Sequence, residues 1–191
     1  LIAFPPCTYL CSSGMHWTVR GLRDPKLTED ALEFVRSLMG ANVPHIALEN
    51  PVGAISTRIR KPDCVVHPWQ YGHPESKTTC LWLKNLPALN PTNILQKPES
   101  GRWENQTPSG QNKLAPSKDR WKERSKTYKG IAQAMAEQWS AFVLSSRTNS
   151  PSVNAAESLG ALFTWNTTPT VPASDPTTLK MKGIDWSMRT E

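Results

Sequence analysis

The type and setting of Cys7 could support nucleophilic chemistry. Cys7 follows Leu1–Phe4, a short apolar run that predicts a buried strand, and Pro5 and Pro6 end that strand in a rigid turn. A thiol at the C-terminal edge of a sheet lies where open α/β sheets bind ligands, and a stiff turn suits a nucleophile. The alternative is that Cys7 is a small buried hydrophobic residue, the commonest role of a free cysteine.

Glu49 is the second candidate, and a strand–helix–strand pattern determines where it lies. Apolar residues recur at helical spacing between residues 28 and 40, and we expect Thr28 to cap this helix. The apolar run 43–48 predicts a second buried strand, which we expect Pro51 to end. Two strands joined by a helix run parallel, so Cys7 and Glu49 are predicted at the same edge of the sheet. The alternative for Glu49 is a solvated strand end.

The composition predicts one globular domain with an appendage. The chain of 191 residues is 38% hydrophobic, includes 17 prolines and contains no apolar run long enough to span a membrane. No charged segment followed by an apolar one marks secretion. The four cysteines form no C-x-x-C pair, which indicates neither a metal site nor a disulfide framework and favours a reducing, cytoplasmic compartment.

The positive charge is unevenly distributed. The four basic and four acidic residues of 145–191 cancel, so the net charge of +6 lies in residues 1–144, which fits a polyanionic partner. The chain begins with Leu1 inside an apparent strand and not with Met. We therefore expect either processing or a longer polypeptide of which this chain is the later part.

The remaining segments predict loops, one further strand and two helices. We expect a mobile loop over His16–Arg23, a basic loop over Ser56–Pro62 and a short strand over Cys80–Leu83. Residues 84–116 are polar and proline-rich without periodicity, which predicts an exposed excursion. A basic helical stretch follows at Lys118–Arg124, and a helix over 128–142 places Ile131, Met135, Trp139 and Phe142 on one face. Residues 145–191 are rich in Ser, Thr and Pro and predict an irregular tail.

Taken together, these motifs resemble the cytosine-C5 DNA methyltransferases, especially short phage and prophage versions. The nucleophile motif of that family, Pro-Pro-Cys-Gln-x-Phe-Ser-x-x-Gly, is similar to residues 5–14, which keep both prolines, the cysteine and the final glycine. The family's Glu-Asn-Val motif resembles Glu49-Asn50-Pro51. Its Tyr-Gly-x-Pro-Gln-x-Arg-x-Arg motif resembles residues 71–79, and its last helix opens with a Gly-Asn pair that Gly130 resembles more weakly.

The resemblance implies a fold and a set of roles. It implies a partial Rossmann-like body over residues 1–144, with a mainly parallel sheet, flanking helices and a target-recognition segment over 84–127. It implies a DNA partner, a cytoplasmic protein of a bacterial or phage-infected cell, and methyl transfer from S-adenosylmethionine to C5 of a flipped cytosine. Cys7 would add to C6 of the base, and Glu49 would bind N3 and the amino group. Base or DNA contacts would come from Pro6, Asn50, Arg58, Arg60, Lys77, Arg120, Lys122 and Arg124.

The sequence also departs from the family. Lys77 replaces an arginine, so the resemblance leaves base positioning to Arg58 or Arg60, and these cations would also lower the pKa of Cys7. Only Gly130 matches the cofactor motifs; the remainder of the cofactor pocket is expected upstream of Leu1, so activity is expected of a complete protein. Two alternatives stay open: a non-catalytic, methyltransferase-derived DNA-binding or structural protein, and a thymidylate-synthase-like pyrimidine C5 enzyme.

Overall fold

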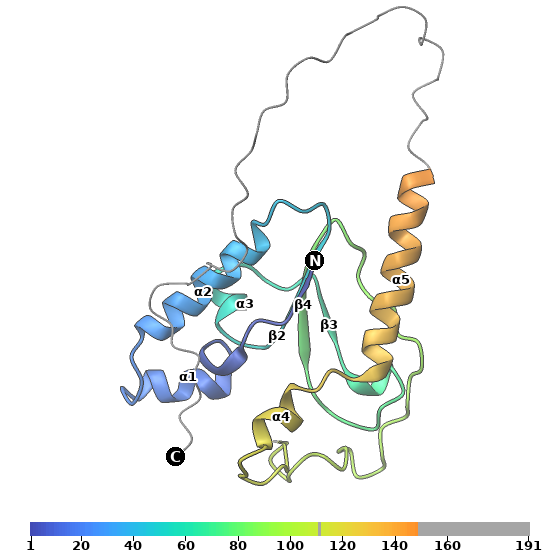
Figure 1. Cartoon of the computed structure of the whole chain (residues 1–191). Coiled ribbons are helices and arrows are strands. Elements are labelled where there is room, and N and C mark those ends of the chain that lie inside the picture. The colour runs from blue at the N-terminus through green and yellow to red at the C-terminus, as the bar shows by residue number, and fades with distance from the viewer. Residues whose placement is uncertain (111, 149–191) are drawn as a thin grey trace, which may run out of the picture. The chain divides into compact units, whose positions relative to one another are not determined.

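The computed structural model describes residues 1–110 and 112–148, which form a mixed α/β fold (Figure 1). A four-stranded sheet has the order β1-β2-β4-β3, and helices flank it. The elements are β1 (Ile2–Ala3), α1 (Ser12–Val19), α2 (Lys26–Met39), β2 (Ile46–Pro51), α3 (Ala54–Arg58), β3 (Cys64–Val66), β4 (Thr79–Lys84), α4 (Arg120–Ser125) and α5 (Lys129–Thr148). Short 3-10 turns, η1 (Cys7–Tyr9) and η2 (Pro68–Gln70), complete them.

The sheet is mixed, which corrects the prediction of a mainly parallel sheet. The predicted parallel unit is confirmed, because β1 pairs with β2 in parallel, Ile2 against Ala47 and Ala3 against Leu48. Strand β4, however, pairs antiparallel with both β2 and β3. The chain passes from β3 to β4 through η2 and a polar loop without a long crossover helix, and a connection of this kind returns the chain in the opposite direction.

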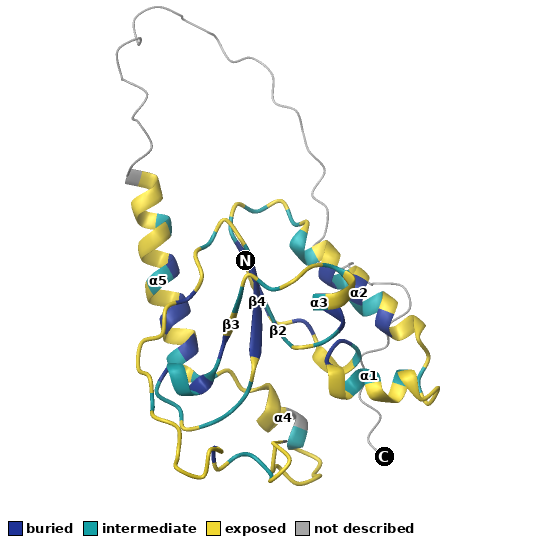
Figure 2. Ribbon diagram, turned by 180° about the vertical axis from the view of Figure 1, so that it is seen from behind, coloured by how far each residue is buried: buried dark blue, intermediate teal, exposed yellow. Residues whose placement is uncertain are grey.

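Alternating side chains of β2 and β4 place two apolar cores on the two faces of the sheet. Leu48 and Trp82 pack with residues of α2 and α3 in the α2-side core (Leu10, Leu32, Val35, Leu48, Ala54, Ile55, Cys80 and Trp82). Ala47 and Leu81 point to the other face and pack in the α5-side core (Ala47, Val66, Tyr71, Leu81, Leu89, Ile131, Ala134, Met135 and Trp139). This period of two follows from the pleat of the strands. Figure 2 shows β4 as a largely buried strand, with the exposed surfaces of the helices on the outside.

Several element boundaries differ from the sequence predictions. Helix α2 begins at Lys26, whose amide donates to Asp24 Oδ1 at 2.8 Å, so Thr28 lies inside the helix and is buried. Strand β2 begins at Ile46 and includes Pro51 as its final residue, paired with Thr79. The predicted mobile loop over His16–Arg23 is largely helix α1, and α3 occupies the start of the predicted loop over Ser56–Pro62.

The predicted boundary between the globular body and the tail also differs from the structure. Helix α5 continues to Thr148, so the predicted tail boundary after residue 144 falls inside the helix; the rest of the predicted tail, 149–191, lies outside the described residues. Ile131, Met135 and Trp139 are buried as predicted, whereas Phe142 is 37% exposed. Residues 85–110 and 112–119 contain neither helix nor strand, as expected of the excursion. None of the helices in the described ranges is long and apolar enough to cross a membrane.

Candidate active site

The parallel pairing of β1 and β2 brings Cys7 and Glu49 to the same edge of the sheet. Ala3 pairs with Leu48, so Glu49 lies one residue beyond the last pair of the β1–β2 ladder. Asn50, which is 1% exposed, joins the two strand ends, because its Nδ2 donates to the Pro5 carbonyl at 2.8 Å. The glutamate and the amide leave opposite faces of β2. The amide therefore fixes the turn before Cys7 while Glu49 turns toward α5.

The turn that carries Cys7 is pinned against the loop that follows β2. The Leu10 carbonyl accepts the Ala54 amide at 2.7 Å, and the Ser12 amide donates to the Val52 carbonyl at 3.0 Å. Gly53 is required where these segments meet, because a Cβ there would lie 1.9 Å from the Leu10 carbonyl oxygen. A Cβ on Gly14 would lie 2.0 Å from the Thr8 carbonyl oxygen. Glycine at both positions lets two backbones approach to the contact that orients the thiol.

The Cys7 thiol interacts directly with the Cys11 thiol one turn later. The hydrogen bond between the two side chains is the largest cause that raises the pKa of Cys7, and burial and the charge of Cys11 raise it further. The same bond lowers the pKa of Cys11 to about 5, together with the Ser13 hydroxyl, whose Oγ lies 3.3 Å from Sγ, and the Gly14 amide. The expectation that nearby cations lower the pKa of Cys7 below its ordinary value is therefore wrong. The negative charge of the pair rests on Cys11.

Glu49 lines a small cavity on the α5 side of the sheet. Burial raises the pKa of its carboxyl, and the positive charge of Lys77 opposes that rise. The cavity measures about 30 Å³ and is bounded by Phe4, Glu49, Lys77, Thr79, Ser125, Thr127, Tyr128, Ile131 and Met135. Such a volume holds about one water molecule. Glu49 lies close enough to Cys7 for its charge to raise the pKa of the thiol.

The segment around α4 covers this cavity and is held by Lys77. Lys77 Nζ donates to the carbonyls of Arg124 at 2.9 Å and Lys126 at 3.5 Å. The positive charge of Arg124 acts to lower the pKa of both Cys7 and Cys11. Tyr128 borders the cavity and donates to Glu75 Oε2 at 2.5 Å, which fixes the ring against the start of α5.

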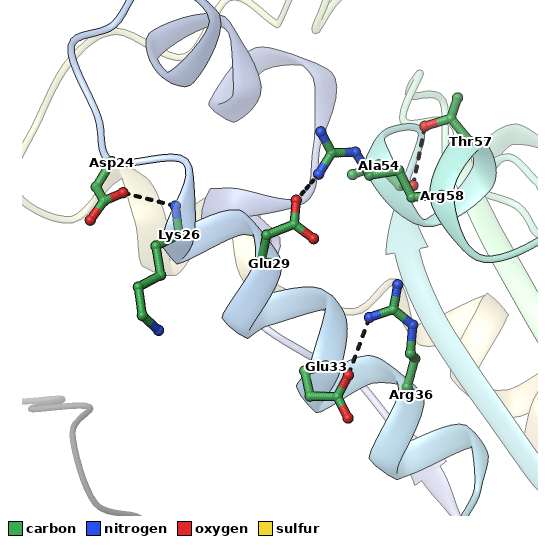
Figure 3. A network of polar contacts seen from close by, with 8 residues as sticks. All are labelled: Asp24, Lys26, Glu29, Glu33, Arg36, Ala54, Thr57 and Arg58. Atoms are coloured by element: carbon green, nitrogen blue, oxygen red, sulfur yellow. Dashed lines mark hydrogen bonds and ion pairs between the residues drawn. The ribbon is translucent and has the colours of Figure 1, made fainter.

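Two predicted site residues lie elsewhere. Arg58 forms an ion pair with Glu29 of α2 (Figure 3), so its guanidinium is committed to holding α3 against α2. Arg60 forms an ion pair with Asp63 at 2.8 Å and donates to the Leu83 carbonyl at 3.0 Å. Leu83 pairs with Ala47 near the beginning of β2, away from the edge that carries Glu49. Neither arginine is among the groups that shift the pKa of Cys7, and their contact with a base or with DNA stays a prediction.

The other predicted contacts divide between the site and the surface of α4. Pro6 precedes η1 and positions Cys7, while Asn50, Lys77 and Arg124 lie at the site as described. Lys122 forms an ion pair with Asp119 at 3.0 Å, with both side chains exposed. Arg120 begins α4. Lys122 is therefore accessible to a polyanion, whereas Arg120 is half-buried and its Nε is buried without a hydrogen-bond partner.

Gly130 serves packing at the first turn of α5. A Cβ at this position would lie 2.0 Å from the Tyr71 carbonyl oxygen. The Gly130 amide already donates to His73 Nε2 at 2.9 Å, so it is not free to bind a cofactor. Packing against Tyr71 therefore accounts for a glycine at this position, and a cofactor role of Gly130 stays a prediction.

Sequence reasoning missed Cys11, Glu75 and Tyr128 as parts of the site. The spacing of Cys7 and Cys11 offered one signal, because residues four apart share one face of a helical turn. Glu75 and Tyr128 lie 53 positions apart, and only the tertiary fold brings them together. Comparisons of the chain with models of protein families, with curated proteins and with solved structures find no match.

Proposed function

We propose that this chain carries the covalent half of a DNA cytosine-C5 methyltransferase, in which S-adenosylmethionine would supply the methyl group. One observation carries the proposal: the parallel β1–β2 pair places a cysteine and a partly buried glutamate at one edge, joined by the Asn50–Pro5 hydrogen bond. The motif resemblance supplies the reaction class. DNA as partner and a cytoplasmic setting belong to the same proposal, supported by the positive charge of residues 1–144.

The residues of this chain would activate the base as follows. Cys7 would react from the minor form of the pair, in which Cys11 holds the proton, and its sulfur would form a bond to C6 of cytosine. The electron pair of the C5–C6 double bond shifts to form a C4–C5 double bond, and the C4–N3 pair moves onto N3. A proton from Glu49 neutralises the negative charge that develops at N3. Burial raises the pKa of Glu49, which favours the protonated acid that this step needs. C5 is then nucleophilic, as methylation requires.

Entry of the base requires the α4 segment to move. The cavity beside Glu49, about 30 Å³, is far smaller than a pyrimidine, and the α4 segment that borders it is held by Lys77. A base inside a duplex cannot be reached by a thiol and must be turned out of the stack. DNA phosphates that bind Arg120 and Lys122 would pull α4 away from the cavity as the base enters. These contacts would give affinity without sequence information.

A non-catalytic, methyltransferase-derived DNA-binding protein is the second candidate. Two observations favour it: the pKa of Cys7 is raised, so its thiol holds the proton, and the Glu49 cavity, bordered by the α4 segment, is too small for a base. In that case basic residues of α4 would bind DNA while the thiol stays unreacted. The two candidates differ in one observable, the bond between Cys7 and C6.

The test is covalent capture by the chain as it stands. We would incubate it with a pool of DNA duplexes in which 2-pyrimidinone replaces one cytosine within randomised flanks. This ring lacks the electron-donating amino group, so it accepts a thiol at C6 without a methyl donor. We expect an adduct that survives denaturation and maps to the tryptic peptide of residues 1–20, which contains Cys7 and Cys11. Cys7→Ser is expected to abolish it and Cys11→Ser to slow it.

Matched controls separate chemistry from folding. Cys64 packs against the α5-side core, and we expect the Cys64→Ser variant to form the adduct like the wild type. Glu49→Gln keeps the shape of the side chain but loses the acid, so we expect capture at least about tenfold slower, in line with general acid catalysis. An adduct that persists in Cys7→Ser would contradict the nucleophile assignment. DNA binding by a folded chain with no adduct in any duplex would refute the enzyme and favour the second candidate.

A further inference from the structure

We propose that Cys7 and Cys11 form a reversible oxidation site, in which a hydroperoxide converts the two thiols into an intramolecular disulfide. The pair consists of one exposed and one buried cysteine, both free in this structure. The chemistry of the pair does not depend on the proposed function. Only its consequence for catalysis does, because a disulfide would leave Cys7 without a thiol to add to C6.

The backbone places the two sulfurs within reach of each other. The Cys11 amide donates to the Cys7 carbonyl at 2.9 Å, so the residues are successive along one helical turn. Side chains at this spacing have Cβ atoms about 5–6 Å apart, whereas a disulfide needs about 3.5–4.5 Å. Closing the bond therefore requires a movement of roughly 1–2 Å.

The required movement falls on the Cys7 side of the pair. Cys11 is buried, forms a β-bridge with Gly53 and is followed by Ser12, whose amide is bonded to the Val52 carbonyl. Cys7 instead begins η1, a three-residue turn without any buried residue. Since the bond forms only after this turn tightens, we expect it to be readily reduced by small thiols.

The charges around the pair favour a resting thiolate at Cys11. The Cys11 sulfur meets the Ser13 hydroxyl, the Gly14 amide at the beginning of α1, and the charge of Arg124. The Cys7 sulfur interacts with Cys11 and feels the charges of Arg124 and Glu49, which have opposite effects on its pKa. A thiolate beside an exposed second thiol is the arrangement in which one sulfur is oxidised and the other resolves it.

The reaction balances with a hydroperoxide as the oxidant. The exposed Cys7 sulfur reacts from the minor form of the pair, in which Cys11 holds the proton: it attacks the terminal oxygen of the hydroperoxide, forming a sulfenic acid and an alkoxide that takes the proton from Cys11. The Cys11 thiolate then attacks the Cys7 sulfur, forming the disulfide and expelling hydroxide. Two electrons pass from the thiols to the O–O bond. Two equivalents of a small thiol return the pair to its reduced state.

The remaining two cysteines provide internal controls. Cys80 belongs to the α2-side core and Cys64 packs against the α5-side core, so the sheet lies between their sulfurs. Burial raises the pKa of both thiols, which keeps them protonated and slow to oxidise. In a tryptic digest Cys64 and Cys80 fall in different peptides from residues 1–20. Their alkylation therefore reports on non-specific oxidation in the same sample.

The experiment treats the full chain with hydrogen peroxide, blocks free thiols with iodoacetamide and digests without reductant. We expect the peptide of residues 1–20 to be unalkylated and lighter by two hydrogens, while the peptides carrying Cys64 and Cys80 stay alkylated. Dithiothreitol is expected to restore alkylation at both sites of peptide 1–20. In Cys11→Ser the light peptide is expected to disappear and Cys7 to accumulate as a sulfenic acid that dimedone labels. Cys64→Ser is expected to behave like the wild type.

Other outcomes would overturn the proposal. Oxidation of Cys7 to a sulfinic acid while Cys11 remains alkylatable would show that Cys11 does not resolve it. A disulfide between the Cys7 residues of two chains would show that Cys7 reacts as a single exposed thiol and does not pair with Cys11. Disulfide formation in a chain that never captures 2-pyrimidinone would uphold the oxidation site and reject the proposed function. Capture of 2-pyrimidinone by a chain that forms no disulfide would uphold the proposed function and reject the oxidation site.

Discussion

The hydrogen bond between Asn50 and Pro5 offers the sharpest test of how the site is held together. Asn50→Ala removes the Nδ2 donor and leaves the Pro5 carbonyl without its 2.8 Å partner. A buried acceptor left unpaired costs about 1–3 kcal/mol. Asn50 Oδ1 is itself buried without a partner, so its removal recovers part of that loss. We therefore expect the free energy of unfolding to fall by about 1–2 kcal/mol, in the lower part of the range.

Asn85 provides a matched control for this substitution. Its Nδ2 also donates to a proline carbonyl, that of Pro44, at 2.8 Å, but this hydrogen bond is exposed to solvent. Asn85 has a φ of 53°, which glycine adopts without strain, so Asn85→Gly removes the bond without forcing the backbone. Water replaces the lost partner at an exposed site. We expect Asn85→Gly to lower the free energy of unfolding by less than about 1 kcal/mol.

The measurements are urea unfolding and thermal unfolding of the three proteins, combined with the rate at which iodoacetamide labels Cys7. A loss of 1–2 kcal/mol corresponds to a decrease in melting temperature of roughly 2–8 °C for a domain of this size. Because the bond fixes the turn before Cys7, we also expect Asn50→Ala to change the labelling rate and Asn85→Gly to leave it unaltered. Equal losses in both variants, or an unchanged Asn50→Ala protein, would refute the reasoning that burial makes this bond important.

Two further predictions concern the cavity. The pKa of Glu49 is raised in the folded chain above its ordinary value of 4.5, so its contribution to stability is present at low pH and lost as the pH rises through the raised value. Urea unfolding across this range should show wild type losing stability relative to Glu49→Gln, and parallel pH profiles would contradict this. Lys77→Met removes the bond from Nζ to the Arg124 carbonyl, so limited trypsin digestion after Lys122 should become faster. Lys84→Met removes a similar bond, to Ala41 at 3.2 Å, and should leave that cleavage unchanged, whereas equal rates in both variants would show that Lys77 does not hold α4.

The sequence could predict which backbone segments form the site edge. The apolar run before Pro5 and the helix between the strands predict a parallel pair, and the observed register of β1 and β2 places Cys7 and Glu49 accordingly. The inward face of α5 also follows from helical spacing, because Ile131 and Trp139 are buried. These features depend on residues close in sequence, whose periodicity already specifies which side turns inward.

Only the tertiary structure decided which partners the polar side chains take. Arg58 and Arg60 look similar to Lys77 in the sequence, yet Glu29 and Asp63 pair with the arginines, while Lys77 reaches the carbonyl of Arg124. The antiparallel pairing of β4 with β2 and β3 is also a tertiary feature, because the polar loop before β4 does not specify which strands it will pair with.

The thiol pair combines both kinds of information. The spacing of Cys7 and Cys11 is visible in the sequence, and the bonds from Cys7, Ser13 and Gly14 that favour the charge on Cys11 are local, whereas Arg124, far along the chain, adds a smaller effect on both thiols. The pKa of a thiol depends on groups within a few ångströms, whatever their distance in sequence. Local pattern therefore determined where the candidate nucleophile lies and which thiol it pairs with, and long-range packing of the α4 segment determined the access of substrate to Glu49.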